Sequence, residues 1–216
     1  MTILGGDYSH WNDPNFLALA AAGHRFCWLK CTEGISFVDP RYSAHRTGAQ
    51  KSSMKTGAYH YFRAAWGGDT QAQHFFDNAF NDALPPAIDV ERYNNSGFTK
   101  STFAARLRLC LLGVEQRFGK KPIIYTSKYA WEELVGLAGW EDEYDLWVAH
   151  YTSALMPLLP NGWTDYEVWQ FTSTPLDTNR MVPAYWSNIL GSPPVEDTVM
   201  ITIKKTTAEN LKEALG

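Results

Sequence analysis

Two hydrophobic periods alternate along this chain. Runs rich in β-branched and aromatic residues predict strands, which we place at 3–8, 25–32, 56–62, 86–91, 122–126, 146–151 and 167–171. Between these runs, apolar residues recur every three or four positions and predict helices at 14–22, 40–52, 69–80, 100–118 and 128–137. The pattern at 100–118 is the clearest, and Gly119 follows it as a C-terminal stop. Alternating strands and helices are typical of an α/β fold built on a parallel sheet.

The segment between the last two predicted strands is rich in Pro and Gly and predicts no helix. Some strands therefore lack a following helix, and the pattern predicts a barrel with missing helices. A chain of 216 residues is long enough to bury the core of one such domain.

The pattern changes after Tyr185. A Gly- and Pro-rich stretch at 191–197 reads as a linker, followed by an alternating run at 199–203 and a possible helix at 208–215. We therefore predict one barrel domain over residues 1–185 and a linker with a short appendage over 186–216. Fewer than about 40 residues rarely fold alone. We expect residues 186–216 to form a strap on the barrel or, alternatively, to contact another protein or a second copy of this chain.

Charge and cysteine content limit the partners and the compartment. The net charge is −4, and Lys and Arg do not cluster, so neither nucleic acid nor a membrane is an expected partner. The N-terminus has no signal-peptide pattern, and no apolar stretch is long enough to cross a bilayer. Cys27 and Cys31 lie roughly 13 Å apart on one predicted strand, too far for a disulfide, which leaves a free thiol. We expect synthesis in the cytoplasm.

Polar and aromatic residues mark the C-terminal end of each predicted strand. In barrels of alternating strands and helices, the reactive side chains project from these ends. The residues at these positions are Asp7, His10, Lys30, Glu33, His60, Tyr61, Asp89, Glu91, Tyr125, His150, Tyr151, Trp169 and Gln170. A ring of this kind predicts a site for a polar ligand at one mouth of the barrel.

The strongest single feature is Pro86-Ala-Ile-Asp89-Val-Glu91, an apolar strand that ends in two carboxylates. Two residues apart on a strand, they share a face at about 6.5 to 7 Å. Burial and like charge raise one pKa in such a pair, leaving a protonated donor beside an ionised partner, as glycoside hydrolysis requires. A salt-bridged loop entrance or a metal site is an alternative interpretation.

A metal-dependent hydrolase is the competing functional hypothesis. Asp7, Asp89, Glu91, His60 and His150 include the ligand types of a divalent ion, but no short-spaced motif such as His-x-His supports one. The chain also lacks a Gly-x-Ser-x-Gly elbow and a phosphate-binding Gly-rich loop. We therefore expect neither a metal nor another cofactor.

Several ordered segments together resemble one known family. They are Asp7-Tyr-Ser-His-Trp11, Leu29-Lys-Cys-Thr-Glu33-Gly34, Asp39-Pro-Arg-Tyr42, Gly57-Ala-Tyr-His-Tyr-Phe62, Pro86-Ala-Ile-Asp-Val-Glu91, Lys121-Pro-Ile-Ile-Tyr125, Leu146-Trp-Val-Ala-His-Tyr151, Trp169-Gln170 and Asp177-Thr-Asn179. Over roughly residues 3–182, the chain resembles glycoside hydrolase family 25 lysozymes, the Chalaropsis-type muramidases found in phages and bacteria.

The resemblance implies a flattened, irregular (β/α) barrel, TIM-like with eight strands and fewer helices. It implies cleavage of the β-1,4 bond between N-acetylmuramic acid and N-acetylglucosamine in bacterial peptidoglycan. Glu91 is then the general acid, beside Asp89, with Asp7 and Asp177 completing the acidic cluster. The implied substrate-binding residues are Glu33, Tyr59, Tyr61, Tyr125, Trp147, Tyr151 and Gln170.

The resemblance also suggests where such an enzyme acts. A phage-type lysin is made in the cytoplasm and reaches the cell wall after release. The alternative from a different class is a non-catalytic glycan-binding or virion structural component on the same fold. The carboxylate spacing leaves retaining, inverting and substrate-assisted mechanisms open.

Overall fold

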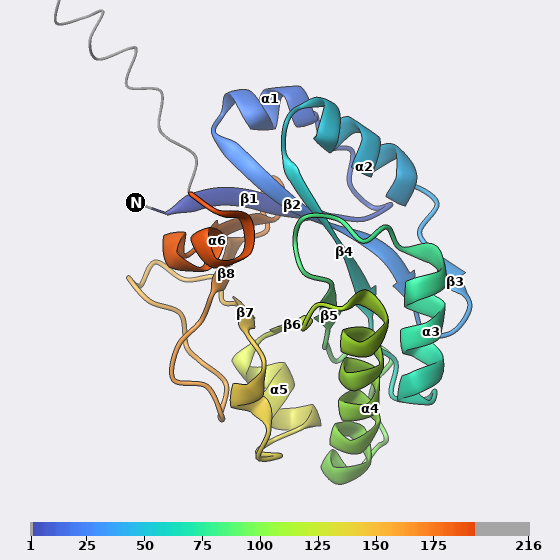
Figure 1. The fold of residues 1–216 in the computed structure, drawn as a ribbon. Helices are drawn as coiled ribbons and strands as arrows, with labels where there is room; N and C mark the ends of the chain where they lie inside the picture. The colour runs from blue at the N-terminus through green and yellow to red at the C-terminus, as the bar shows by residue number, and fades with distance from the viewer. Residues whose placement is uncertain (1, 193–216) are drawn as a thin grey trace, which may run out of the picture.

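The computed structural model describes residues 2–192. Within this range, nine strands form one sheet in the order β1-β9-β8-β7-β6-β5-β4-β2-β3, and β1 also pairs with β2. This extra pairing closes the sheet into a barrel (Figure 1). The short β3 lies outside the ring and pairs with β2, so eight of the described strands make up the barrel.

Seven strands fall where the apolar runs predicted them. The strands are β1 (Ile3–Tyr8), β2 (His24–Glu33), β3 (Phe37–Val38), β4 (Lys55–Tyr61), β5 (Ala87–Asp89), β6 (Ile123–Thr126), β7 (Leu146–Ala149), β8 (Val168–Thr172) and β9 (Thr178–Met181). Neighbours from β1 through β8 around the ring are parallel, whereas β9 is antiparallel to both β1 and β8. The unpredicted strands are β3, whose two apolar residues make too short a run, and β9, which carries no apolar run.

The helices are α1 (Phe16–Ala21), α2 (Tyr42–Lys51), α3 (Gly68–Asn78), α4 (Lys100–Phe118), α5 (Lys128–Leu134) and α6 (Pro183–Leu190), with a 3-10 turn at Glu141–Glu143. The bounds of α4 match the sequence prediction. Thr99 caps its start by accepting from the backbone N–H of Thr102, and Gly119 ends it at φ 65°. The segment between β7 and β8 runs as a long loop, as predicted (Figure 1).

The last described helix, α6, was not predicted. Pro183 opens it, and Tyr185 and Trp186 are buried in the barrel interior, where the Trp186 ring lies 6.5 Å from that of Phe26. The predicted division at residue 185 therefore falls within this helix. Residues 193–216, which include the predicted run and terminal helix, lie outside the described range, so the two-part division stays a prediction.

Large side chains fill the barrel interior. Trp28 stacks on Trp147 with ring centroids 4.7 Å apart, and its Nε1 donates to the carbonyl of Pro85 at 2.9 Å. Gly57 makes room for this stack, because a Cβ there would lie 2.7 Å from the Trp28 indole nitrogen. A second core lies between the strands and helices α2, α3 and α4. The packed interior supports the site from below, and Trp147 reaches the pocket above it.

Cys27, Cys31 and Cys110 are buried free thiols, consistent with the prediction that at least one thiol is unpaired. Among residues 2–192, no helix combines the length and apolar character needed to cross a membrane.

Candidate active site

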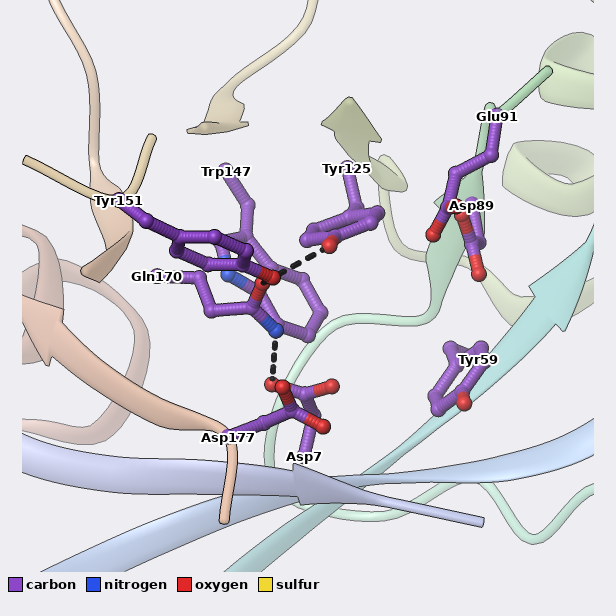
Figure 2. Close-up of a pocket in the computed structure, with 9 residues that line it drawn as sticks. All are labelled: Asp7, Tyr59, Asp89, Glu91, Tyr125, Trp147, Tyr151, Gln170 and Asp177. Carbon is purple, nitrogen blue, oxygen red and sulfur yellow. Dashed lines mark hydrogen bonds between the residues drawn. The ribbon is translucent and has the colours of Figure 1, made fainter. Parts of the chain in front are cut away.

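A pocket opens at the mouth of the barrel where the parallel strands end (Figure 2). Its lining comes from most of the ring, and six of its members lie on β1, β4, β5, β6, β7 and β8. The lining residues are Asp7, Tyr59, Asp89, Glu91, Tyr125, Trp147, Tyr151, Gln170 and Asp177. The structure thus brings together all four predicted acids and five of the predicted substrate-binding residues.

Parallel register places these side chains at one level of the barrel. Asp89 on β5 is paired with Tyr125 on β6, and Tyr125 is in turn paired with Trp147 on β7. Residues paired in this way point to the same face of a sheet. The short strands therefore deliver an acid, a phenol and an indole to one surface.

Asp7 is held by two amides. Gln170 Nε2 and Asn179 Nδ2 each donate to Asp7 Oδ2 at 2.8 Å, and Figure 2 shows the Gln170 bond. The hydroxyls of Tyr125 and Tyr151 donate to Gln170 Oε1 at 2.9 and 2.7 Å.

Trp147 supports the second amide, because its Nε1 donates to Asn179 Oδ1 at 2.8 Å. Each amide accepts on its oxygen, so its NH2 group is presented to Asp7. The orientation of both amides follows from this network.

Burial changes the protonation of Asp7 and of its neighbour Asp177, which together form what we call the amide-held side of the pocket. It raises the pKa of Asp7 to about 8, with the neighbouring charge of Asp177 as the second cause and the Asn179 and Gln170 hydrogen bonds opposing. Burial, followed by the charge of Glu91, raises the pKa of Asp177 to about 6. At neutral pH, Asp177 is therefore mainly ionised, while Asp7 mostly holds a proton.

Asp89 and Glu91 form a carboxyl pair on the other side of the pocket (Figure 2). Burial raises the pKa of both, and the charge of Glu91 raises that of Asp89 further. Lys30 opposes the shift in both groups. Asp89 Oδ1 is buried and finds no hydrogen-bond partner among the described residues. The pair therefore favours one shared proton over two negative charges.

Two predicted substrate-binding residues, Glu33 and Tyr61, do not line this pocket. The Glu33 carboxylate accepts from Lys30 Nζ at 2.7 Å and from Arg63 Nη1 at 2.8 Å. The Tyr61 hydroxyl donates to the backbone carbonyl of Tyr93, and Lys30 Nζ lies 5.0 Å from the Tyr61 ring centroid. Both residues contact Lys30 and support the wall beside the Asp89–Glu91 pair.

Sequence reasoning gave no role to Asn179 or Lys30. Asn179 is fully buried on β9, a strand without an apolar run, and only its place in the Asp177-Thr-Asn179 segment marked it. Lys30 was noted at a strand end, yet its effect on the carboxyl pair depends on how the sheet places β2 and β5 on either side of β4. A buried lysine in an apolar strand is the signal that could have drawn attention to it.

The two histidines of the metal hypothesis are engaged in hydrogen bonds with other groups of the protein. His60 contacts Thr32 Oγ1 at 2.8 Å and Gln71 Oε1 at 3.2 Å, and burial lowers its pKa to about 3. His150 Nδ1 accepts from the backbone N–H of Leu158. Over residues 2–192, no group of three or more His, Cys, Asp or Glu side chains is arranged to hold a metal ion.

Comparisons with known proteins cover most of the barrel. The family model for glycosyl hydrolases family 25 matches residues 6–178. Lysozyme M1 of Streptomyces globisporus is 29% identical over 184 residues, which is 80% of this chain and 62% of that protein. The chain thus spans about 60% of the length of the first curated relatives that it matches.

Solved structures share the architecture. A family GH25 lysozyme from Aspergillus fumigatus superposes with a TM-score of 0.81 at 28% identity, covering 89% of this chain and all of that one. A muramidase from Acremonium alcalophilum has a TM-score of 0.76 at 31% identity, with 83% of this chain and 93% of that chain covered. These likenesses agree with the predicted eight-stranded barrel with fewer helices. The chain belongs to glycosyl hydrolase family 25.

Proposed function

We propose that this protein is a peptidoglycan muramidase that cleaves the β-1,4 bond between N-acetylmuramic acid and N-acetylglucosamine, with Glu91 as its general acid. The observation that carries the proposal is the buried Asp89–Glu91 pair, which faces Asp7 and Asp177 across one pocket. The relatives named lysozyme and muramidase support this class of substrate.

Glycosidic cleavage needs a proton on the leaving oxygen while positive charge grows at the anomeric carbon. Burial raises the pKa of Glu91 and so favours its protonated form, which can donate that proton. When the shared proton lies on Glu91, Asp89 beside it is ionised, and Asp177 supplies a second negative charge from the opposite side. In a buried pocket these charges stabilise the transition state more than they would in water.

Five aromatic or amide side chains complete the proposed binding surface. Tyr59, Tyr125 and Trp147 line the pocket, and Tyr151 stands at the rim, 56% exposed. Rings with polar tips suit a sugar, which has apolar CH faces and many hydroxyls. Gln170 orients Asp7 and so links this surface to the acids.

The proposed substrate, peptidoglycan, lies in the cell wall, outside the cytoplasm. We propose that the protein works on the cell wall after release from the cell that makes it, as a phage-type lysin does. Its partner is then the glycan strand of peptidoglycan itself.

The decisive experiment is digestion of purified peptidoglycan by the wild type and by Glu91→Gln. Products are reduced with borohydride, and mass spectrometry identifies the new reducing ends. We expect reduced muramic acid from the wild type and a loss of rate of about 10²- to 10⁴-fold in the variant, because the proton donor is gone. Glu143→Gln, which removes an exposed carboxylate elsewhere, is the matched control.

Each other outcome has a distinct meaning. The absence of soluble fragments from wild type and variant alike would favour the non-catalytic glycan-binding component. Equal rates would show that another carboxylate donates the proton. Loss of wild-type activity on adding a chelator would favour the metal-dependent hydrolase.

A further inference from the structure

A groove lies at the end of the barrel opposite to the acidic pocket, and we name it the basal groove. It encloses about 290 Å³ beside residues that come just before β5, β6 and β7 and beside the last turns of α6. The residues that matter for its chemistry are Pro85, Lys120, Lys121, Asp145, Tyr185 and Ile189. Because the acidic pocket lies where the same strands end, the basal groove is separate from the proposed substrate site.

The basal groove has more positive than negative charge. The ammonium groups of Lys120 and Lys121 each donate to a backbone carbonyl, which is neutral and does not cancel their charge. Asp145 is the acid in the lining, and its carboxylate shares a hydrogen bond with Tyr185. Two ammonium groups beside one carboxylate favour an acidic ligand.

The described part of the chain ends close to the apolar side of this groove. Ile189 lines the groove and comes three residues before Ser192, the last residue described. Gly191 ends α6 at φ 86°, and Trp186 Nε1 donates to the carbonyl of Ser192 at 3.3 Å. The hydrogen bond holds Ser192 beside α6, so the chain continues from a point next to the groove.

The residues that follow Ser192 match the groove in their order and in their charge. Residues 193–197, which lie outside the described range, read Pro-Pro-Val-Glu-Asp, and we name them the acidic segment. Apolar residues come first in this segment, nearest to Ile189, and the two acids follow. An extended chain spans at most about 3.6 Å per residue, so the segment can reach about 18 Å from Ser192. This length is enough to cross the groove.

We propose that the acidic segment docks in the basal groove, with Val195 against Ile189 and its two acids beside Lys120 and Lys121. The contact combines burial of apolar surface with paired charges. It is the first part of the strap expected over residues 186–216, and it holds α6 in place, because the segment follows this helix directly. The inference does not depend on the proposed function, since the groove and the acidic pocket lie at opposite ends of the barrel.

Zero-length cross-linking of the full chain tests the contact directly. A water-soluble carbodiimide joins a carboxylate to a lysine amine that touches it, and peptide mass spectrometry locates the link. We expect Glu196 or Asp197 to be linked to Lys120 or Lys121 within monomers. Lys55 is the matched control, because it is exposed and starts β4 at the same end of the barrel, and we expect no link to it.

Charge reversal tests the same contact through stability. We expect Lys121→Glu, and separately the pair Glu196→Lys and Asp197→Lys, to lower the melting temperature by about 1–4 °C each. Combining all three changes restores opposite charges and should recover at least half of the summed loss. Glu209→Lys makes the same kind of change outside the acidic segment and should leave the melting temperature unchanged.

Three results would overturn the inference. Links from the acidic segment to Lys55 as frequent as those to Lys120 and Lys121 would show that the segment has no fixed place. Links found in covalent dimers and absent from monomers would show that the occupant comes from a second copy of this chain. A combined variant that melts as low as the sum of its parts would show that the charges do not meet.

Discussion

The two sides of the acidic pocket hold their carboxyl groups in different ways. Asp7 receives two amide donors, each fixed by an aromatic side chain behind it. Asp89 has a buried oxygen without a partner among the described residues, and its neighbour is another acid. One side therefore has a carboxyl group fixed by amide donors, and the other has two neighbouring carboxyl groups that favour one shared proton.

This difference fits a division of labour. Donors aimed at a carboxylate stabilise its charged form and hold it in place, which suits a group that meets positive charge. A carboxyl that must release a proton to substrate cannot have every oxygen engaged by the protein. On the proposed function, the amide-held side orients and stabilises, and the Asp89–Glu91 side transfers the proton.

Removing the ionisable group at Asp7 tests the amide-held side most strongly. We expect Asp7→Asn to lower kcat on peptidoglycan about 10²- to 10³-fold, since the neutral amide cannot ionise as positive charge grows at the anomeric carbon. The fold is expected to persist, because the Asn oxygen still accepts from Gln170 and Asn179. Release of reducing ends measures the rate, and wild-type activity in this variant would contradict the division of labour.

The same variant has a second, thermodynamic readout. The pKa of Asp7 is raised from 3.8 to about 8, so the folded state binds its proton more tightly than the unfolded state does. This contribution to stability is complete below pH 3.8 and is lost as pH rises towards 8.

We therefore expect Asp7→Asn to melt higher than the wild type near pH 8, with a smaller difference near pH 4. For a chain of this size, each kcal/mol corresponds to roughly 2–4 °C. Thermal unfolding followed by circular dichroism across this range measures the difference. A difference in melting temperature between Asp7→Asn and the wild type that narrows as pH rises would show that Asp7 is not buried as described.

Gln170→Ala removes one of the two amides and should have a smaller effect. We expect kcat to fall about tenfold, since Asp7 keeps only the Asn179 donor and the Tyr125 and Tyr151 hydroxyls lose their acceptor. Because the Gln170 hydrogen bond lowers the pKa of Asp7, its loss should raise that pKa further.

Carboxyl NMR titration of Asp7 in both proteins measures the second effect. Tyr151→Phe serves as the milder control, because the Tyr125 hydroxyl still fixes the orientation of Gln170. A lowered Asp7 pKa in Gln170→Ala would contradict the assigned network.

The contrast between the two sides also explains what could be predicted from the sequence. Asp89 and Glu91 lie two residues apart at the end of an apolar run, so local periodicity alone placed both acids at one mouth. Helix α4 was predicted to the residue, because its apolar spacing and its cap residues agree.

The amide-held side depends on tertiary pairing that no local pattern encodes. Asn179 reaches Asp7 because β9, with no apolar run, inserts antiparallel between β1 and β8. The placement of Tyr61 likewise depends on the Tyr93 carbonyl, 32 residues away. The β2–β4 ladder also shifts register between Lys30 and Thr32, which simple alternation cannot predict.

The smallest expected effect on the rate comes from Lys30 variants, which test the Asp89–Glu91 side of the pocket, the side proposed to transfer the proton. The ammonium group of Lys30 favours the ionised forms of Asp89 and Glu91 and so holds their pKa values down against burial. Lys30→Met should raise both, leaving the rate at the optimum within about threefold, because Glu33 keeps its contact with Arg63. Activity is lost as Glu91 gives up its proton, so the alkaline limb of kcat/KM should move up by roughly one pH unit. Lys30→Arg keeps the positive charge and should keep the alkaline limb of the wild type. An alkaline limb that does not move in Lys30→Met would show that Glu91 is not the group that transfers the proton.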